Sequence, residues 1–309
     1  MHKYVIKRLL LLIPILLGVA FIVFSILSLT PGDPGTLILG ETAPREAIEK
    51  LNEQLGFNKP FLVRFADYVI GALHGDFGTS YRSGLPVFQE IFARFSITLT
   101  IAVLAILTAL FVGIPAGILS AVKQYSAADV ISTVAAMLMA AIPGFWLGLM
   151  MIILFSLKLG WLPSYGVGSF AHYIMPTLIL AIPCSAGLLR LTRTTMLETI
   201  RQDYIRTARA KGASETKVIW KHALKNALLP VITVAGMEFG ALLGGTVIAE
   251  AVFSIPGVGM MLLTAIRMKD VPLVMASVIF LALLFCFIML LIDLAHAFVD
   301  PRVKAMYSR

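Results

Sequence analysis

The sequence of 309 residues is too apolar for a water-soluble protein. Hydrophobic residues make up 59% of it and charged residues only 14%, which is typical of a chain that crosses a membrane several times. The net charge of +8 does not indicate nucleic-acid binding, because most basic residues stand at the ends of apolar spans, as the positive-inside bias predicts. Cys184 and Cys286 lie inside apolar segments, so neither a disulfide framework nor a cysteine metal site is indicated.

The first predicted span runs from Leu9 to Leu29 and follows the basic residues Lys3, Lys7 and Arg8. Its uncharged run is longer than the apolar part of a typical signal peptide, and no small-x-small cleavage site follows it. We therefore predict that residues 1–29 comprise a cytoplasmic N-terminus and an uncleaved first membrane helix.

Residues 30–94 are polar, with eight acidic and six basic residues, and are predicted to form an extended extracytoplasmic segment. A short helix is predicted from Glu46 to Leu55, ended by Gly56. Asp33 and Asp76 are interpreted as turn residues rather than catalytic acids, because each stands in a cluster of turn-forming residues. These clusters are Pro31 to Pro34 and Gly75 to Ser80.

Five further apolar runs are long enough to cross a membrane. They lie at about Phe95 to Val122, Val130 to Leu157, Tyr173 to Leu189, Leu229 to Val252 and Val271 to Leu291. Six spans place both termini on one side, and 16 of the 25 basic residues then fall on that side, which is predicted to be cytoplasmic. The predicted fold is thus an all-α integral membrane protein, with a core at residues 95–309 that contains a cytoplasmic loop at 190–229.

Several predicted spans contain helix-breaking residues. Pro115, Pro143 and Pro183 stand within or near the middle of spans, with glycines close by. Such residues free backbone groups that neighbouring helices or water must satisfy, so they are typical of proteins that move or enclose a cavity.

The cytoplasmic loop contains the longest basic run of the chain, Asp203 to Pro230. The pattern predicts a helix up to Lys211, a left-handed turn at Gly212, and a second, amphipathic helix capped by Ser214 with Glu215 in its first turn. Its apolar face comprises Val218, Ile219, Ala223, Leu224, Ala227 and Leu228. A lysine stripe, Lys217, Lys221 and Lys225, faces either lipid headgroups or a partner protein.

The fifth span contains Gly236, Gly240 and Gly244 at four-residue spacing, and Glu238 among them. The glycines indicate either helix packing within the chain or contact with a second subunit across a translocation path. An ionised carboxylate inside hydrocarbon costs several kcal/mol, so Glu238 is expected to face protein or water. Glu250 is expected at the membrane surface, in a structural role.

After the fifth span, about a dozen apolar residues up to Ile266 are too few to cross a membrane. This stretch is predicted to be a short helix in or near the outer interface.

The loop resembles the EAA loop of permease subunits in bacterial ABC importers, and within these the peptide and nickel branch. The resemblance is carried by the runs Tyr204-Ile205-Arg206-Thr207-Ala208-Arg209-Ala210-Lys211-Gly212 and His222-Ala223-Leu224-Lys225-Asn226-Ala227-Leu228-Leu229-Pro230. Arg206 stands where the general motif has glutamate, which is typical of this branch. The stretches PGDP, LGFNKP and GDFGTS in the first extracytoplasmic segment extend the resemblance over nearly the whole chain.

The resemblance implies a permease in the bacterial cytoplasmic membrane. Its partners would be a second, homologous permease subunit, two cytoplasmic ATPase subunits that bind ATP and magnesium, and an extracytoplasmic solute-binding protein. The residues implied to couple the permease to the ATPases are Tyr204, Arg206, Thr207, Ala208, Arg209, Lys211, Gly212, Ser214 and Glu215. The class handles dipeptides, longer peptides, glutathione and nickel complexes, and the sequence leaves these open.

No catalytic motif is found in the sequence. It contains no phosphate-binding GxxxxGK[ST] loop and no HExxH, and its five histidines are scattered, so no catalytic residue, metal ligand or cofactor is assigned to this chain. Two alternatives are weaker: a secondary transporter, which would be expected to show an internal repeat and paired intramembrane charges, and an intramembrane hydrolase, which needs a positioned nucleophile and base.

Overall fold

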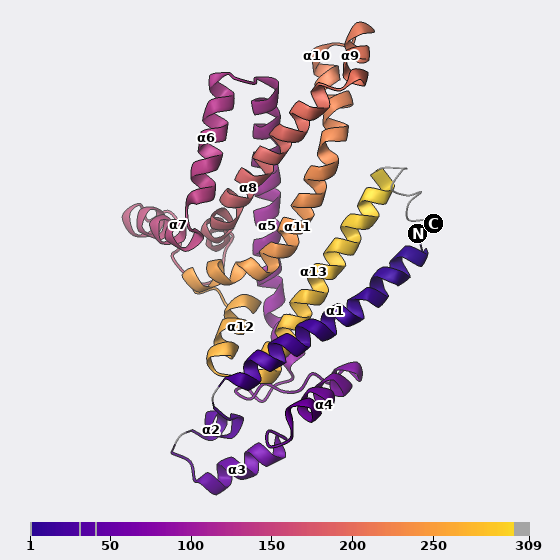
Figure 1. Ribbon diagram of the computed structural model, residues 1–309. Helices are drawn as coiled ribbons and strands as arrows, with labels where there is room; N and C mark the ends of the chain where they lie inside the picture. Colours follow the sequence, from indigo (N-terminus) through magenta and orange to yellow (C-terminus); the bar gives the residue numbers. More distant parts are fainter. Residues whose placement is uncertain (1, 31, 41, 300–309) are drawn as a thin grey trace. The chain divides into compact units, whose positions relative to one another are not determined.

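The computed structural model describes residues 2–30, 32–40 and 42–299, and every regular element among them is a helix (Figure 1). The predicted all-helical membrane fold is thus confirmed. The chain forms two compact units: one contains the described residues up to Ile97 together with Pro256–Leu290, and the other contains Thr98–Ile255 and the described residues from Leu291. The predicted turn at Pro31 and the C-terminal tail from Asp300 lie outside the described residues.

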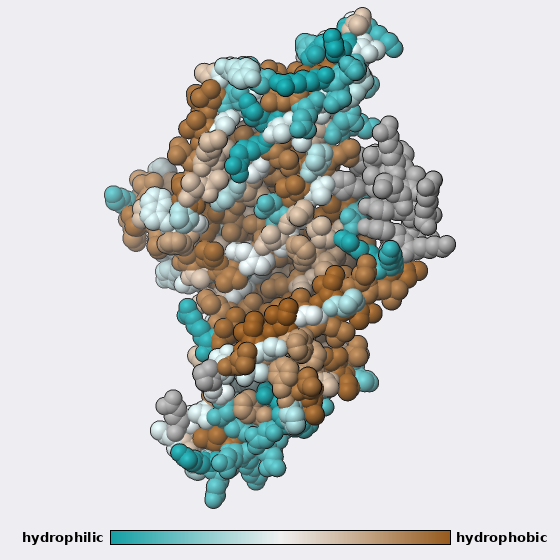
Figure 2. Space-filling model, in the orientation of Figure 1, coloured by the Kyte–Doolittle hydropathy of each residue, from teal (hydrophilic) through white to brown (hydrophobic). Residues whose placement is uncertain are grey.

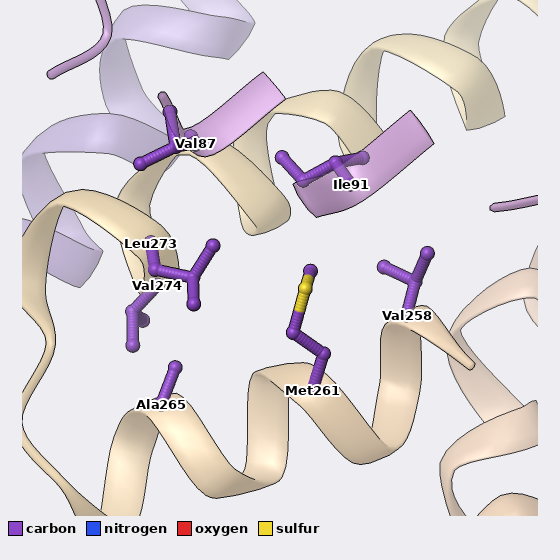
Figure 3. Close-up of a cluster of buried hydrophobic side chains, with 8 residues drawn as sticks. Val87, Ile91, Val258, Met261, Ala265, Leu273 and Val274 are labelled. Atoms are coloured by element: carbon purple, nitrogen blue, oxygen red, sulfur yellow. The ribbon is translucent and has the colours of Figure 1, made fainter. Parts of the chain in front are cut away.

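In the first unit, helix α1 (His2–Leu29) is accompanied by the first turns of α5 (Val87–Val122), by α12 (Val258–Arg267) and by most of α13 (Val271–Val299). The helix α12 confirms the short apolar helix predicted after the fifth span. One face of it packs into a hydrophobic cluster with the two neighbouring helices (Figure 3). The cluster contains Val87, Ile91, Val258, Met261, Ala265, Leu273 and Val274.

The helices α2 (Pro34–Leu39) and α3 (Arg45–Gln54) are joined through Asp33 and Asn52. Asp33 caps α2, because its Oδ1 accepts from the Thr36 amide at 2.8 Å. The same oxygen accepts from the Asn52 side-chain amide at 2.6 Å, and the hydrogen bond from Asn52 lowers the pKa of Asp33 below its usual value. The helix predicted from Glu46 to Leu55 is confirmed as α3, and Gly56 follows it with φ +69°.

Helix α4 (Phe61–Leu73) was not predicted from the sequence. Its Phe61 and Phe65 pack against Phe21 and Phe24 of α1, with ring centroids 5.3 to 5.9 Å apart. One face of α4 is therefore fixed to the last turns of the first membrane helix.

The second unit contains most of α5, then α6 (Ala127–Ala141), α7 (Gly144–Met151), the π-helix η1 (Ile152–Lys158) and α8 (Ala171–Ile200). Helices α5 and α8 approach closely at two glycines. A β-carbon on Gly113 would lie 2.8 Å from the Ser185 carbonyl oxygen, and one on Gly117 would lie 2.6 Å from the Thr192 β-carbon. Only glycine permits this contact, as in other small-xxx-small helix pairs.

The third predicted span, Val130 to Leu157, is broken in the structure. Among the described residues, five helices are individually long and apolar enough to cross a membrane, and the predicted sixth crossing requires that α6 and α7–η1, bent by 96°, form one broken span. Pro143 disfavours a helical conformation at the preceding residue, and Ile142 is accordingly extended with ψ 124°.

Two helices extend beyond the apolar runs predicted from the sequence. Helix α5 begins at Val87 rather than Phe95, and α8 continues to Ile200, which lies inside the predicted loop at 190–229. On the other side of the loop, α10 (Glu215–Lys217), the π-helix η2 (Val218–Ala223) and α11 (Leu224–Val252) follow one another without a break, so the second loop helix is continuous with the fifth span.

Glu250, for which a structural role at the membrane surface was expected, is enclosed by protein. Its side chain is fully buried in the second unit, where Oε1 accepts from the Thr98 hydroxyl of α5 at 2.7 Å. A carboxylate is tolerated inside a helix bundle where polar groups of the protein surround it. The hydrogen bond between Thr98 and Glu250 links α5 to α11, which agrees with the structural role expected for Glu250.

Candidate functional site

The loop between α8 and α11 begins with helix α9 (Asp203–Ala210), which ends in a glycine turn. Gly212 has φ +81°, as the sequence analysis predicts. The Gly212 amide donates to the Arg209 carbonyl at 2.9 Å, and the Ala213 amide donates to the Ala208 carbonyl at 3.2 Å. These two hydrogen bonds define a Schellman motif, which needs a left-handed residue at the position of Gly212.

The apolar faces of the two loop helices pack within the chain. Ile205 of α9 and Val218 and Ala223 of η2 are completely buried, together with Met196 of α8. The loop is thus fixed against its own membrane helices by hydrophobic contacts. Only the opposite, polar side of the loop is available for a partner.

The polar side of the loop is held together by side-chain hydrogen bonds. The Arg209 guanidinium donates to both carboxylate oxygens of Glu215, at 2.7 and 3.2 Å, across the glycine turn. This interaction raises the pKa of Arg209 above its usual value. The Asn226 amide donates to the Tyr204 hydroxyl at 2.8 Å and thereby connects α9 to α11.

The other loop residues singled out in the sequence differ in exposure. Arg206, Thr207, Lys211 and Ser214 are exposed, whereas Ala208 is half-buried. Ser214 has the extended conformation of an N-cap residue, but its side chain makes no capping hydrogen bond. Figure 2 shows the resulting hydrophilic surface over α9 and α10.

Sequence analysis missed Trp220, which is 58% exposed among the exposed Lys217, Lys221 and Lys225. The signal in the sequence was weak, because Trp220 stands one turn after Lys217 but also one turn before the apolar Ala223 and Leu224.

An ion pair supports the last turns of α8, where they lead into the loop. Arg193 of α8 donates through Nε and Nη2 to the two carboxylate oxygens of Asp129 in α6, at 2.7 and 2.9 Å. Asp129 also accepts from the Ser120 hydroxyl and from the Tyr125 amide. No pattern in the sequence indicates this pair, since its members stand in different helices, 64 residues apart.

A second candidate site is a cavity of about 450 Å³ between α6, α7, α8 and α11. Its wall is mostly apolar, and Glu238 and Arg190 are its charged residues. Neither side chain has an ion pair or hydrogen bond with another residue in the described part of the chain. The sequence analysis pointed to Glu238 but assigned Arg190 to the loop, because the predicted fourth span ended at Leu189.

The three glycines of α11 have different surroundings. A β-carbon on Gly236 would lie 2.0 Å from the terminal methyl of Ile292 in α13, so this glycine serves packing within the chain. Gly240 is buried, whereas a β-carbon on Gly244 would meet no atom within 4 Å. Within the described residues, no group of three or more His, Cys, Asp or Glu side chains could share a metal ion.

Comparison with known families identifies the chain over nearly its whole length. Residues 113–305 match the family described as binding-protein-dependent transport system inner membrane component. Residues 1–102 match the N-terminal family of the same transport systems.

Two of the relatives that were found match this chain over nearly its full length. The dipeptide transport system permease protein DppB of Alkalihalophilus pseudofirmus is 40% identical, covering 98% of this chain and 100% of the relative. The glutathione transport system permease protein GsiC of Escherichia coli (strain K12) is 41% identical, covering 98% of this chain and 99% of the relative.

Solved structures agree in fold. A chain of the MetNI methionine ABC transporter, in an inward-facing conformation, superposes with a TM-score of 0.58 at 21% identity, covering 70% of this chain and 98% of that chain. An amino acid ABC transporter with histidines gives a TM-score of 0.52 at 13% identity, covering 70% of this chain and 94% of that chain. The family matches over both parts of the sequence and the two relatives assign the chain to the binding-protein-dependent inner membrane components. It is a multi-pass ABC importer permease of the peptide and nickel type.

Proposed function

We propose that this chain imports short peptides, as one of two homologous permease subunits that enclose the translocation path of an ATP-driven importer. The observation that carries the proposal is the likeness over the full length to permeases named for dipeptide and glutathione transport. Glutathione, itself a small peptide, is the second candidate substrate. Nickel complexes, the third candidate of the sequence analysis, have no comparable observation in their favour.

The proposal places the chain in the bacterial cytoplasmic membrane with both termini inside. An extracytoplasmic solute-binding protein would deliver the peptide, and two ATPase subunits would bind ATP and magnesium and dock on the polar side of the loop. No cofactor is assigned to this chain itself, and nucleic acid is not a partner. Alternating access would expose the path first to one side of the membrane and then to the other.

The loop can transmit ATPase movement because its shape is determined by several interactions. The Schellman turn at Gly212 fixes the angle between the helices, and the Arg209–Glu215 pair spans that turn. The buried Ile205 and Val218 attach the loop to the membrane helices. A displacement of its polar side would therefore reach α8 and α11 rather than be absorbed within the loop.

The cavity with Glu238 and Arg190 suits a peptide with free ends. Such a peptide carries an ammonium at one end and a carboxylate at the other, and the cavity offers one charged side chain of each sign on an apolar wall. Glu238 is half-buried, and a charge left without a partner among membrane helices is costly, so it gains from the ammonium of such a substrate. Arg190 is exposed and offers the opposite charge to the carboxylate. We assign Glu238 to the amino end and Arg190 to the carboxyl end.

Uptake of labelled alanyl-alanine tests the proposal, measured in cells that carry the complete importer and lack other peptide transporters. Deletion of this chain should abolish uptake, and unchanged uptake of both alanyl-alanine and glutathione would refute the proposed function. Glu238→Gln and Arg190→Gln should each lower uptake by about tenfold, as expected when a charge-assisted hydrogen bond is lost.

Blocked peptides show which end each residue binds. The wild-type importer should take up the free peptide faster than the N-acetylated or the C-amidated form. The Glu238→Gln variant should take up the N-acetylated form as well as the free peptide. The Arg190→Gln variant should take up the C-amidated form as well as the free peptide. Glu49→Gln, which removes an exposed carboxylate on α3, is the matched control and should behave as wild type. If Glu238→Gln and Arg190→Gln discriminate as wild type does, the cavity does not bind the peptide ends.

A further inference from the structure

The first unit contains a cavity of about 260 Å³ beside helix α4. Its wall is formed by α1, the turn between α3 and α4, α4 itself, the loop after α4 and the start of α13. Arg64 of α4 lies in this wall, with its guanidinium carbon 4.5 Å from the ring centroid of Phe57 and 5.5 Å from that of Phe24. Two aromatic rings thus hold the guanidinium in place.

Polar groups in this cavity lack partners. Among the described residues, no acceptor forms a hydrogen bond or ion pair with the Arg64 guanidinium, which carries five N–H donors. One turn further along α4, the Tyr68 hydroxyl is buried and has no hydrogen-bond partner in the described part of the chain. Buried polar groups in folded proteins are nearly always paired, so the Tyr68 hydroxyl indicates an acceptor that comes from outside the chain, and the half-buried Arg64 guanidinium beside it can bind the same acceptor. Burial lowers the pKa of Arg64 and raises that of Tyr68, which agrees with their poor hydration.

The same cavity also carries negative charge. Asp67 pairs with Lys59 at 2.7 Å, and Asp76 accepts from the Gly78 amide at 2.9 Å and has no cationic partner among the described residues. The formal charges of Lys59, Arg64, Asp67 and Asp76 sum to zero. A simple anion would meet two carboxylates here, whereas a ligand with an oxyanion and a nearby ammonium would match both signs.

The place of α4 in the fold indicates where such a ligand comes from. The helix packs on Phe21 and Phe24, which lie within about two turns of the end of the α1 membrane span at Leu29. On its other face, apolar side chains are exposed, with Leu62 at 68% and Leu73 at 80%. An amphipathic helix at the end of a membrane span, with exposed leucines, is typical of elements that lie in the lipid interface.

We propose that this cavity binds the headgroup of a zwitterionic phospholipid that carries a primary ammonium, such as phosphatidylethanolamine. The phosphate accepts hydrogen bonds from Arg64 and Tyr68, and the ammonium lies near Asp76. The acyl chains run along the exposed apolar face of α4 and along α1. The lipid belongs to the leaflet that the C-terminal end of α1 reaches. It is a site for a membrane component, separate from any path for the transported solute.

Native mass spectrometry of the purified, delipidated importer titrated with phosphatidylethanolamine tests this proposal. The wild-type complex should bind one molecule of this lipid per chain, ahead of weaker binding elsewhere. Arg64→Met should weaken this first binding by about tenfold or more, as expected from the loss of a charge-assisted hydrogen bond. Arg45→Met removes an exposed cation from α3, away from the cavity, and should leave binding unchanged.

Two further variants separate a lipid site from a structural role. Tyr68→Phe removes a hydroxyl that has no partner among the residues that the structure describes, so the melting temperature should not fall, yet lipid affinity should drop about threefold. Asp76→Asn should weaken binding of phosphatidylethanolamine but not of phosphatidylcholine, whose ammonium has no N–H group to donate.

Equal lipid binding by wild type and Arg64→Met would overturn the proposal. Displacement of the lipid by millimolar alanyl-alanine would overturn it as well, because the cavity would then be a peptide site. Neither result bears on uptake through the cavity at Glu238, so the proposed function is tested separately.

Discussion

Replacement of Gly212 by valine is the most direct test of the loop as the coupling element. Gly212 has φ +81°, a conformation that a β-branched residue strongly disfavours. A β-carbon there would meet no atom within 4 Å, so no steric clash contributes and the whole cost comes from the backbone. That cost is about 1 to 3 kcal/mol, with asparagine lowest, alanine intermediate and valine highest. The chain can avoid it by giving up the Schellman turn, which changes the angle between α9 and α10.

Gly75 provides a matched control. It has φ +82°, a β-carbon there would also meet no atom within 4 Å, and the amides of Gly75 and Asp76 form the same pair of hydrogen bonds at the end of α4. Gly212→Val and Gly75→Val should therefore lower the thermal stability of the purified importer to a similar extent. Only the change at the coupling element should abolish substrate-stimulated ATP hydrolysis and uptake.

The assay is substrate-stimulated ATP hydrolysis and peptide uptake by the complete importer in proteoliposomes. With Gly212→Val, the complex should assemble with normal subunit stoichiometry but lose stimulated hydrolysis and uptake together, whereas Gly212→Asn should retain most of both. Gly75→Val should keep both activities. If Gly212→Val transports normally at full stoichiometry, the loop does not transmit the ATPase movement and the reasoning is refuted.

Two further predictions concern stability, measured by thermal unfolding of the purified protein. Asp129→Asn should destabilise it by about 3 kcal/mol. This is the lower end of the range for breaking a buried ion pair, because the Arg193 side chain is 26% exposed. Additive effects of Asp129→Asn and Arg193→Gln in a double-mutant cycle would show that the two residues do not interact. Gly236→Ala should cost about 1 to 3 kcal/mol by overpacking against Ile292, and much less when it is introduced into an Ile292→Ala background. An equal cost in both backgrounds would contradict the packing role assigned to this glycine.

The sequence was most informative where local chemistry decides the structure. The left-handed turn at Gly212 followed from a glycine at the end of a helical pattern, and α3 followed from its periodicity and from Gly56. Long apolar runs identified the membrane helices, because a helix of that length is long enough to cross the hydrocarbon core of a membrane. These features depend on a few neighbouring residues, so they can be predicted without the fold.

The break before α7 could not be predicted, because the same residue type gave opposite outcomes. Pro115 and Pro183 lie inside the continuous helices α5 and α8, whereas Pro143 separates two helices bent by 96°. Whether a proline bends a membrane helix depends on which neighbours satisfy the freed carbonyl groups, and this is a property of the packed bundle.

The candidate site was half predicted. Glu238 was identified because a carboxylate in a membrane span is conspicuous by itself. Its counterpart Arg190 was assigned to the loop, since hydropathy ended the fourth span at Leu189 although the helix continues to Ile200. Gly113 and Gly117, where α5 closely contacts α8, stand four residues apart in the sequence. Glycines at the same spacing also occur in α11, so the sequence alone does not show which set of glycines packs against another helix.

The continuity of α10, η2 and α11 has a mechanical consequence. The 38 residues from Glu215 to Val252 are helical without a break, and Glu238 lies about 35 Å along this segment at the rise of an α-helix. If the loop end were held, a rotation of about 10° would move Glu238 by roughly 6 Å. A small angular change imposed at Glu215 is thus amplified at the cavity, with no need for any rearrangement between the two.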